Sequence, residues 1–506
     1  CVDDTKTPVV AASASMVLLK NDPVDGDPLL PVDPQRFDRL LVTGPFAQRA
    51  QLGGYAGIPA GEASTPLDGL RGLAPPQLEV EHRPMQGGLQ VVPETVLHPS
   101  AERLQDQGLI GRYHAGDATG ATAFERLDAR IDFPWDDSIQ NIDAQIPQPR
   151  FAVHWHGVIV PERSGLHSFA IHAGHQTVMW IDGNWVELAG AKHWDPTGAN
   201  ESTPISLEAD RAYEIVIHYA DRGDAAKHVH LSWRQPLPPT SLLNPEQRER
   251  TAVVALFGYD SGDMREGRDN ERLALSPAQQ EDLTRLASAF RHVILVYQGG
   301  TVVVNELEDR IPAVLHSWYP GQEGGHALAD VLFGHCEPGG RMPLTTPRHL
   351  QDLPDFEDYD LRAGRTYRYM DPSRIRYAFG HGLSYSTWDY RDLHAHIERD
   401  ALHIRAVVHN TGKRPGETVA QVYLQEEGRA QAPRLELIAF RRCQLDAGAT
   451  STLHWHIPLQ DLCIWDATRR AQVQRSGSCR IGIGAASDHL QAMTVIDLTG
   501  AASCPP

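Results

Sequence analysis

Residues 251–300 read TAVVALFGYDSGDMREGRDNERLALSPAQQEDLTRLASAFRHVILVYQGG. Two short apolar runs in this stretch, 253–257 and 293–297, each stop at glycine, as buried strands of a parallel sheet do. Between them, Ser276 suits the N-cap of a helix and Pro277 its first position. Apolar residues then recur at helical spacing: Leu283, Leu286, Ala287 and Phe290. The stretch therefore predicts a strand, a helix and a second strand parallel to the first.

The same pattern occurs near the start of the chain. The run Ala11–Leu19 predicts a helix, and the apolar run 39–43 ends at a Gly-Pro pair. Together, residues 10–106 and 250–345 indicate one largely parallel open sheet. In such sheets the loops at the carboxyl ends of the strands form the ligand crevice. We therefore expect the chemistry of this chain in the loop that follows Phe257.

Two other regions have the spacing and turn residues of β structure. Residues 107–238 contain short aromatic-bearing runs between Gly, Asp and Pro, which indicates a β-sandwich or barrel inserted into an α/β domain. Residues 391–506 alternate with period 2 around the turn at 410–412, which is typical of a small sandwich. We expect a multidomain chain of α/β and all-β parts. Its α/β domain would occupy 1–106 and 239–390, on either side of the insert.

Composition limits the class of partner. The 506 residues contain 46 Lys and Arg against 65 Asp and Glu, for a formal net charge of -19. Such a surface repels phosphate backbones and anionic headgroups, so we expect neither nucleic acid nor a membrane surface as partner. No apolar run reaches the length of a membrane-spanning helix. No His or Cys cluster has metal-ligand spacing, so we expect no metal and no cofactor.

The first residue and the cysteines bear on localisation. The chain starts at Cys1, which fits either a fragment boundary or a lipoprotein cut before an acylated cysteine. Four of the six cysteines follow residue 440, so one or two disulfides would form there in an oxidising compartment. Scattered buried thiols fit the same spacing. We expect a secreted, periplasmic or cell-surface protein.

Seven motifs follow one another along the chain, at 15–21, 52–57, 65–70, 317–325, 329–334, 338–343 and 377–385. In this order they resemble the glycoside hydrolase family 3 of β-glucosidases and β-xylosidases. The insert resembles a PA14 domain through Trp155-His-Gly157 and Trp180-Ile-Asp-Gly183. The tail resembles a fibronectin type III-like domain through Asn410-Thr-Gly412 and Leu445-Asp-Ala-Gly448. The resemblance implies an α/β-sandwich domain interrupted by the insert and followed by a β-sandwich.

The resemblance also implies a missing part. Family members of this layout begin with a (β/α)8 barrel, which supplies the nucleophile as an Asp in a Ser-Asp-Trp-like motif. No Ser-Asp-Trp occurs in the sequence, and a barrel of about 300 residues is absent from it. The nucleophile therefore stays unknown. The partners implied are a β-linked oligosaccharide or glycoside and a separate barrel-bearing chain.

For the catalytic acid/base, the resemblance points to Glu266. This carboxyl must be protonated to assist the leaving group and deprotonated to activate water. Asn270 stands where the family has Arg, and many relatives place the acid/base a few residues earlier. Asp263 and Asp260 therefore remain alternatives. The alternative interpretation is that Glu266 is a solvated loop carboxylate without a catalytic role.

Other conspicuous residues are interpreted mainly as structural. Trp180 and Trp185 could stack on a sugar ring, but in a β-sandwich they are expected in the core. The segments around Trp318 and Phe379 are expected to pack and turn beside the crevice. Lectin-type PA14 domains bind calcium through an Asp-Asp pair, and Gly174-His175 stands in that place, so we expect no metal there.

Two hypotheses follow. The first is a retaining, β-glucosidase-like exo-β-glycosidase that supplies the acid/base half of its site and is inactive without a barrel. The second is a non-catalytic carbohydrate-binding or cell-surface protein on the same scaffold. The motifs resemble the glucosidase and xylosidase branches alike, so the sugar is left open.

Overall fold

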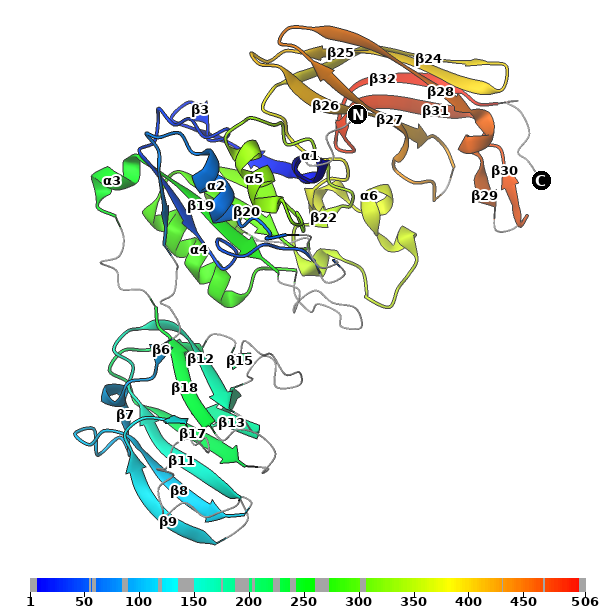
Figure 1. Ribbon diagram of the computed structural model, residues 1–506. Helices are drawn as coiled ribbons and strands as arrows, with labels where there is room; N and C mark the ends of the chain where they lie inside the picture. Colours follow the sequence, from blue (N-terminus) through cyan, green and yellow to red (C-terminus); the bar gives the residue numbers. More distant parts are fainter. Residues whose placement is uncertain are drawn as a thin grey trace. The chain divides into compact units, whose positions relative to one another are not determined.

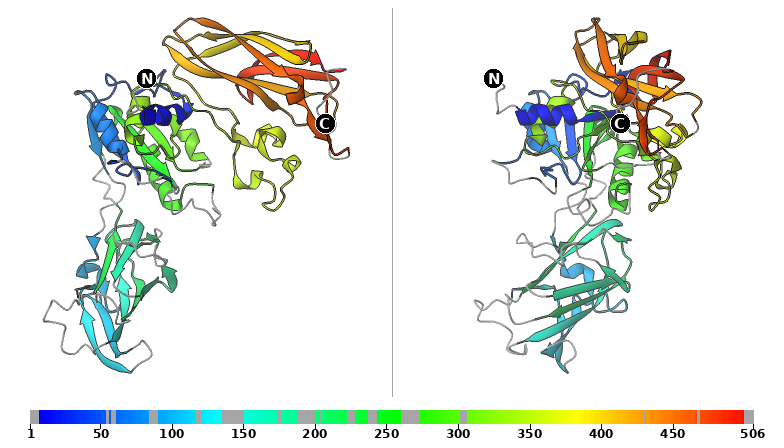
Figure 2. Two further views of the ribbon diagram at one scale, coloured as in Figure 1. Left: turned by 45° about the vertical axis from the view of Figure 1, so that its right-hand side comes forward. Right: turned by 90° about the vertical axis from the view of Figure 1, so that its right-hand side faces the viewer.

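The computed structural model describes residues 7–53, 56, 61–83, 90–116, 121–134, 150–173, 176–186, 200–202, 205–221, 228–236, 243–259, 273–300, 306–429, 431–466 and 469–499. The chain forms two compact units (Figures 1 and 2). The first comprises Cys1–Arg83 and Asn244–Pro506, and the second is Pro84–Leu243. Within the described ranges, no helix is long and apolar enough to cross a membrane.

A six-stranded sheet forms the centre of the first unit. Its strands, in spatial order, are β1 (Val17–Asn21), β21 (Ala313–His316), β20 (Val293–Gln298), β19 (Thr251–Gly258), β4 (Arg39–Thr43) and β5 (Glu79–His82). Every neighbouring pair is parallel except the antiparallel pair of β1 with β21. All residues of β19 are buried, as a central strand covered on both faces requires. The predicted, largely parallel sheet is confirmed.

Helices cover both faces of this sheet (Figure 2). On one face α1 (Thr7–Ser15), α2 (Pro66–Leu73) and α5 (Gly324–Leu332) contribute to one apolar core with the sheet. On the other face lies α4 (Pro277–Ala289). The hydroxyl of Ser276 accepts from the Gln279 N–H at 3.3 Å, which confirms the predicted N-cap. Shorter helical turns are α3 (Pro245–Glu249), α6 (Thr366–Tyr369), η1 (Glu94–Val96), η3 (Glu306–Arg310), η4 (Leu350–Asp352), η5 (Leu361–Ala363), η6 (Pro372–Arg374) and η7 (Leu459–Leu462).

The helix predicted over Ala11–Leu19 is wrong at its carboxyl end. Helix α1 ends at Ser15, and the residues from Val17 onward form β1. Val17 and Leu18 are fully buried in the sheet, where β1 pairs with β21. Sheet pairing and burial therefore override the local helical pattern.

The C-terminal part of the first unit is a β-sandwich, as predicted. One sheet has the order β24 (Trp388–Glu398), β25 (Ala401–Asn410) and β28 (Thr450–Pro458). The other has the order β27 (Glu436–Leu445), β26 (Gly416–Glu426), β31 (Ser478–Ala486) and β32 (His489–Asp497). Both sheets contribute to one apolar core. Two-stranded pairs complete the unit: β2 (Pro23–Val24) with β3 (Asp27–Pro28), β22 (Thr346–Pro347) with β23 (Ile375–Tyr377), and β29 (Ile464–Asp466) with β30 (Ala471–Val473).

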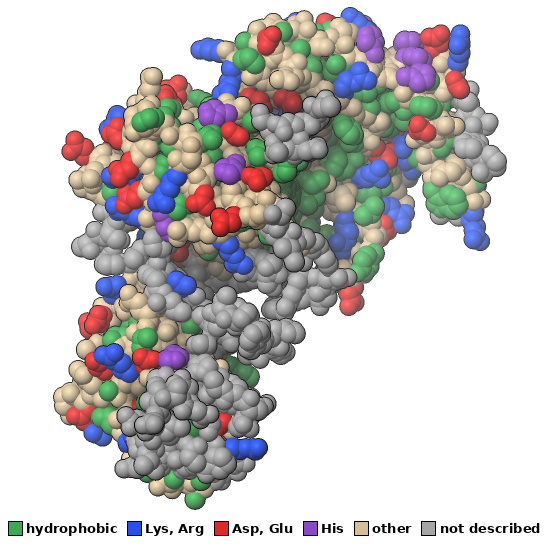
Figure 3. Space-filling model, in the orientation of Figure 1, with side chains coloured by type: hydrophobic (Ala, Val, Ile, Leu, Met, Phe, Trp, Pro, Cys, Tyr) green, Lys and Arg blue, Asp and Glu red, His purple; other side chains and the backbone are tan. Residues whose placement is uncertain are grey.

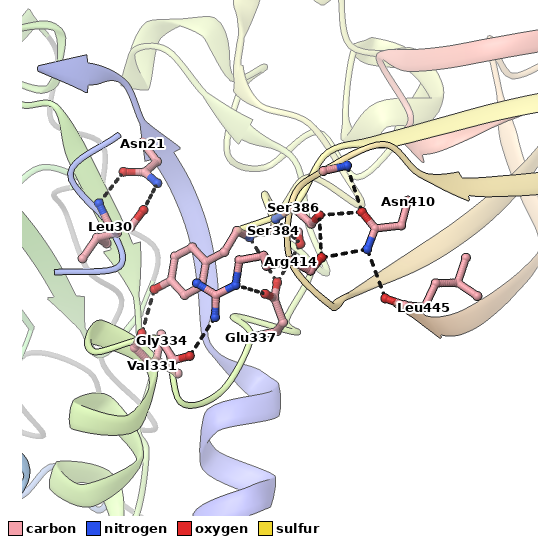
Figure 4. Close-up of polar contacts among 12 residues, drawn as sticks. Asn21, Leu30, Val331, Gly334, Glu337, Ser384, Ser386, Asn410, Arg414 and Leu445 are labelled. Atoms are coloured by element: carbon pink, nitrogen blue, oxygen red, sulfur yellow. Dashed lines mark hydrogen bonds and ion pairs between the residues drawn. The ribbon is translucent and has the colours of Figure 1, made fainter. Parts of the chain in front are cut away.

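A polar junction joins the α/β part to this sandwich (Figure 4). The carboxylate of Glu337, in the loop after α5, accepts from the Ser384 hydroxyl at 2.6 Å. Arg414, between β25 and β26, lies 3.9 Å from the same carboxylate and donates to the Gly334 carbonyl at 2.8 Å. These contacts attach the loop that follows α5 to the segment before β24 and to the β25–β26 turn of the sandwich.

The second unit consists of two antiparallel sheets around one aromatic core. One sheet has the order β14 (Asn184–Val186), β13 (Gln176–Ile181), β17 (Tyr213–Ala220), β11 (Phe151–Ile159), β8 (Leu109–Ala115) and β9 (Thr122–Asp128), with β7 (Leu97–His98) beside β11. The other has the order β10 (Asp132–Pro134), β18 (His228–Arg234), β12 (Gly165–Ala173) and β15 (Asn200–Glu201), with β6 (Gln90–Val91) beside β18 and β16 (Ile205–Leu207) beside β12.

The tryptophans of this unit differ in their environment. Trp155 is fully buried, and its indole N–H donates to Asp128 at 2.7 Å. Trp180 is half-buried on the outer face of its sheet, with its ring centroid 5.0 Å from that of His218. Trp185, on the edge strand β14, is 69% exposed. The expectation that Trp180 and Trp185 lie in the core is therefore wrong, because the two are register partners on the outer face of the sheet, whereas Met179 and Val186 of the same strands are buried.

The cysteines show both predicted states. Cys463 is disulfide-bonded, whereas Cys336, Cys443 and Cys479 are free thiols. Burial raises the pKa of the Cys443 and Cys479 thiols, to about 11 at Cys479, so these two are inert packing residues at neutral pH.

Candidate active site

The carboxyl ends of β19, β20 and β21 meet at one edge of the central sheet, because parallel strands end on the same side. Backbone hydrogen bonds connect the segments that leave this edge. The N–H of Tyr259 donates to the Gln298 carbonyl at 3.0 Å, and the N–H of Gly299 donates to the Trp318 carbonyl at 2.8 Å. The loops that follow β19, β20 and β21 therefore begin side by side at one hydrogen-bonded edge of the sheet.

The three predicted acids Glu266, Asp263 and Asp260 lie in the stretch 260–272, outside the described residues. Both ends of this stretch are described. The Tyr259 hydroxyl donates to the Ala274 carbonyl at 2.9 Å and so closes the base of the loop.

A side-chain amide secures the same loop from α4. Gln279 accepts from the Gly258 N–H at 2.9 Å and donates to the Gly258 carbonyl at 3.1 Å. Gly258 has a φ of 144°, and a Cβ there would lie 1.9 Å from the Gln298 carbonyl oxygen, so only glycine fits. The loop predicted to carry the acid is thus anchored at the carboxyl edge of the sheet.

His316 is the last residue of β21, and it is buried, with 1% of its surface exposed. Burial lowers the pKa of its imidazole to about 3, so the ring is neutral at physiological pH. Its Nδ1 accepts from the backbone N–H of Trp318 at 3.1 Å. A neutral ring with Nδ1 as acceptor carries its proton on Nε2. His316 therefore acts as a positioning residue for the loop around Trp318, as the structural interpretation of that segment expects.

The loop before α5 and the loop before α2 interlock at the same side of the sheet. The Ser64 N–H donates to the Gln322 carbonyl at 2.8 Å, and the Ser64 hydroxyl accepts from the Gly325 N–H at 3.1 Å. A Cβ on Gly69 would lie 2.0 Å from the Gly325 carbonyl oxygen. The glycines of the motifs at 65–70 and 317–325 are therefore required where α2 crosses α5.

Glu308, which the sequence analysis did not single out, is a buried carboxylate that contacts Tyr297 near the carboxyl end of β20. The side chain of Glu308 is 1% exposed and accepts from the hydroxyls of Tyr297 and Tyr377, each at 2.6 Å. The guanidinium of Arg376 donates to it at 2.9 Å. Burial and the carboxylate beside them raise the pKa of both tyrosines well above its usual range. With its oxygens occupied in this way, Glu308 holds β20 and β23 together and is not available as a catalytic acid.

Histidines also gather on the outer face of the larger sheet in the second unit. His154 and His218 are cross-strand partners with ring centroids 4.1 Å apart. Burial, with His218 and His114 nearby, lowers the pKa of His154 to about 4. Among the described residues, no group of three or more His, Cys, Asp or Glu is arranged to hold a metal ion. Residues 174–175, where the sequence has Gly-His instead of a calcium-binding Asp pair, lie outside the described residues.

Comparison with known families agrees with this architecture. The glycosyl hydrolase family 3 C-terminal domain matches residues 16–385, and a fibronectin type III-like domain matches residues 418–487. The first match covers well over half of the chain. The chain belongs to glycosyl hydrolase family 3.

Individual relatives include enzymes named for two sugars. Probable beta-glucosidase J of Aspergillus fumigatus is 28% identical over 507 residues, which cover 89% of this chain and 58% of that protein. Xylan 1,4-beta-xylosidase of Xylanibacter ruminicola is 35% identical over 276 residues, covering 52% of this chain and 31% of that protein. The crystal structure of beta-glucosidase from Kluyveromyces marxianus matches with a TM-score of 0.64 at 22% identity, covering 100% of this chain and 63% of that one. This last match shows a shared fold. The chain thus spans less than two thirds of the length of each of these relatives.

Proposed function

We propose that this chain forms the acid/base side of a retaining exo-β-glycosidase site, with Glu266 as the acid/base and Asp263 or Asp260 as its alternatives. One observation carries the proposal: the loop with these residues leaves and rejoins the carboxyl edge of the sheet, held by the Tyr259–Ala274 hydrogen bond and by the Gln279 amide on Gly258. Ligand sites of open α/β sheets form at this edge.

The proposed reaction needs a second carboxylate. In a retaining glycosidase a nucleophile about 5–5.5 Å from the acid/base forms a glycosyl-enzyme intermediate, which water then hydrolyses with the acid/base now acting as a base. We propose that a (β/α)8 barrel outside these 506 residues supplies this nucleophile, on the same or a separate polypeptide. Without that barrel the chain has little turnover, because the covalent step is lost.

The proposed substrate is a terminal, non-reducing β-D-glucosyl residue. Relatives named β-glucosidase match along most of this chain, whereas the named xylosidase matches along about half of it. A β-xyloside is therefore the second sugar to test.

The second unit is proposed to be a PA14-type domain, and its two antiparallel sheets support this assignment. The proposed location is outside the cytoplasm, as a secreted, periplasmic or lipid-anchored protein. The disulfide at Cys463 supports this location, because such bonds persist in oxidising compartments.

The test measures nitrophenol release from aryl β-glucosides and β-xylosides, by the chain alone and with a family 3 barrel supplied as a second polypeptide. We expect hydrolysis in the mixture, and a loss of at least about 100-fold with Glu266→Gln. Azide should restore turnover of that variant and yield a β-glycosyl azide, because azide attacks the intermediate without base assistance. The matched variants Asp263→Asn and Asp260→Asn should keep most of the activity.

The other outcomes would identify a different acid/base residue or a binding function. If azide rescues Asp263→Asn or Asp260→Asn instead, the acid/base is that residue. If no mixture hydrolyses any glycoside while the chain binds glycans, the chain is a carbohydrate-binding protein on this scaffold, and the glycosidase proposal is wrong.

A further inference from the structure

One face of the β24-β25-β28 sheet carries a cluster of histidines, called the histidine face below. Residues two apart on a strand share a side of the sheet, and the registers of the three strands align them in two neighbouring rows. The rows consist of five histidines and one arginine: His394, His396, His403, Arg405, His454 and His456. Figure 3 shows histidines gathered on this part of the sandwich.

One row crosses all three strands without a gap. The ring of His403 lies between those of its register partners, with centroids 5.4 Å from His396 and 4.7 Å from His456. His396 and His456 are exposed and His403 is half-buried. Because neighbouring strands lie about 4.8 Å apart, this row is about 10 Å long, and the second row lies about 7 Å from it along the strands. It forms a narrow strip of ring nitrogens facing the solvent.

Few acidic groups face this strip. Glu398 lies 4.0 Å from His396 at one end of β24, and at the other end Asp389 pairs with Arg391 at 3.4 Å. Arg405 lies within the strip and Arg441 comes from β27. The β24–β25 turn adds Arg399 and Asp400, one charge of each sign. The charged neighbours are Asp389, Arg391, Asp392, Glu398, Arg399, Asp400, Arg405 and Arg441, and His409, the register partner of Asp389, is a further titratable neighbour. With neutral histidines these charges nearly cancel.

Acidification changes this balance locally. Histidine is the side chain that gains a positive charge between about pH 8 and pH 5, so acidification makes a surface with clustered histidines more positive. Elsewhere in the chain burial opposes the same change, since it lowers the pKa of His154 to about 4 and of His316 to about 3. The chain also has a formal net charge of -19 with neutral histidines. On acidification the histidine face therefore becomes a positive strip on a chain in which 65 Asp and Glu outnumber 46 Lys and Arg.

We propose that the histidine face binds an acidic polysaccharide, a slender chain bearing carboxylates, near pH 5 and releases it near pH 7.5. A single polysaccharide strand can lie along the two short rows of the strip, with Glu398 at one end, 4.0 Å from His396. A nucleic acid duplex or an anionic membrane extends beyond the strip, onto a surface where Asp and Glu outnumber Lys and Arg. Membership in a family of carbohydrate-processing proteins places polysaccharides near the chain. This binding is independent of the proposed glycosidase activity.

The test measures retention of the full chain on immobilised polygalacturonate at pH 5.0 and pH 7.5, in about 0.1 M salt, where charges more than about 10 Å apart are screened. We expect at least tenfold tighter binding at the lower pH. The variant His396→Gln with His456→Gln should lose most of that gain. The matched control is His326→Gln with His335→Gln, two exposed histidines of the α/β part, and it should bind like the unaltered chain.

A gain-of-function variant completes the experiment. Replacing both exposed histidines with arginine, His396→Arg with His456→Arg, fixes the charge and should give tight binding at pH 7.5 as well. The proposal is wrong if retention is equal at both pH values, or if the control pair loses as much as the tested pair. It is also wrong if phosphatidylglycerol vesicles or duplex DNA bind at pH 5.0 while polygalacturonate does not. None of these measurements uses turnover, so the result stands apart from that of the glycosidase assay.

Discussion

His316 and Trp318 lie with their rings stacked, at a centroid distance of 3.9 Å, on either side of the residue that follows β21. Trp318 has a φ of 56°, a left-handed conformation that a residue with a bulky side chain adopts only when its surroundings hold it there. The stack and the hydrogen bond from the Trp318 N–H to His316 supply that restraint. The pair sets the path of the loop at the carboxyl edge.

We expect His316 to make the α/β part less stable as the pH decreases below about 6.5. Its folded-state pKa is lowered to about 3, whereas an unfolded histidine titrates near 6.5, so between these values the unfolded chain binds a proton that the folded chain does not. The contribution of neutral, buried His316 to the free energy of unfolding is complete above pH 6.5 and is lost as the pH falls toward 3. At pH 4.5 the loss is about 2–3 kcal/mol.

The measurement is urea unfolding of His316→Gln at pH 7.5 and pH 4.5. The variant should be less stable at pH 7.5, and its deficit should shrink at pH 4.5. Exposed His326→Gln serves as the control and should follow the unaltered chain at both pH values. A deficit that does not change with pH would exclude a titrating role for His316.

The buried cluster around Glu308 should behave as one unit. Glu308→Gln removes the charge that pairs with Arg376 at 2.9 Å, and we expect a loss of about 3 kcal/mol in the free energy of unfolding. Tyr377→Phe removes a single hydrogen bond to the carboxylate and should cost about 1.5–3 kcal/mol. The exposed partner of the same arginine offers the control: Asp309→Asn should cost less than about 1 kcal/mol. Equal losses for Glu308→Gln and Asp309→Asn would contradict the cluster.

Replacing Asp282 in α4 should stabilise the chain at high pH. Burial raises the pKa of this carboxyl to about 6, against the opposing attraction of Arg285 at 3.3 Å. A raised carboxyl pKa penalises the folded state above pH 6, and the penalty disappears below about pH 4. Asp282→Asn should therefore raise the unfolding free energy at pH 8 by at most about 2–3 kcal/mol and have little effect at pH 4.

Thermal unfolding at these two pH values measures the Asp282 effect. Glu281→Gln, at an exposed neighbouring position, should leave both curves nearly unchanged. Destabilisation by Asp282→Asn at pH 8 would mean that the pair with Arg285 outweighs burial.

Asn410 organises the turn between β25 and β26 (Figure 4). Its amide nitrogen donates to the carbonyls of Arg414 and Leu445, each at 3.0 Å, while its amide oxygen accepts from the Ser386 hydroxyl at 2.6 Å. Asn410→Asp places a carboxylate oxygen against two carbonyl oxygens, so we expect a loss of about 3 kcal/mol or more. Calorimetric unfolding of the chain measures it, and exposed Thr411→Ala should cost less than about 1 kcal/mol. A loss no larger than that of the control would show that the turn forms without these bonds.

Much of the fold could be predicted because local signals agreed with the final packing. The runs 253–257 and 293–297 are apolar at every position, so both faces of each strand must be covered, and a parallel sheet with helices on both sides satisfies this. Ser276 and Pro277 marked the start of α4 through backbone chemistry that needs no tertiary contact. Motif spacing predicted the family. It also predicted a candidate acid at Glu266, which stays a prediction because 260–272 lie outside the described residues.

The remaining features depended on residues that are distant in sequence. The carboxylate of Glu308 is satisfied by Tyr297 and Tyr377, 11 and 69 residues away, and no spacing rule joins such positions. Strands β6 and β7 have two residues each, too few for a periodicity, and only their pairing with β18 and β11 places them in the second unit. The histidine face likewise exists only because the registers of three strands align. The sequence by itself determined which segments must be buried or turned, since those preferences are local. The tertiary structure alone decided which polar groups meet, because that requires the closure of long loops.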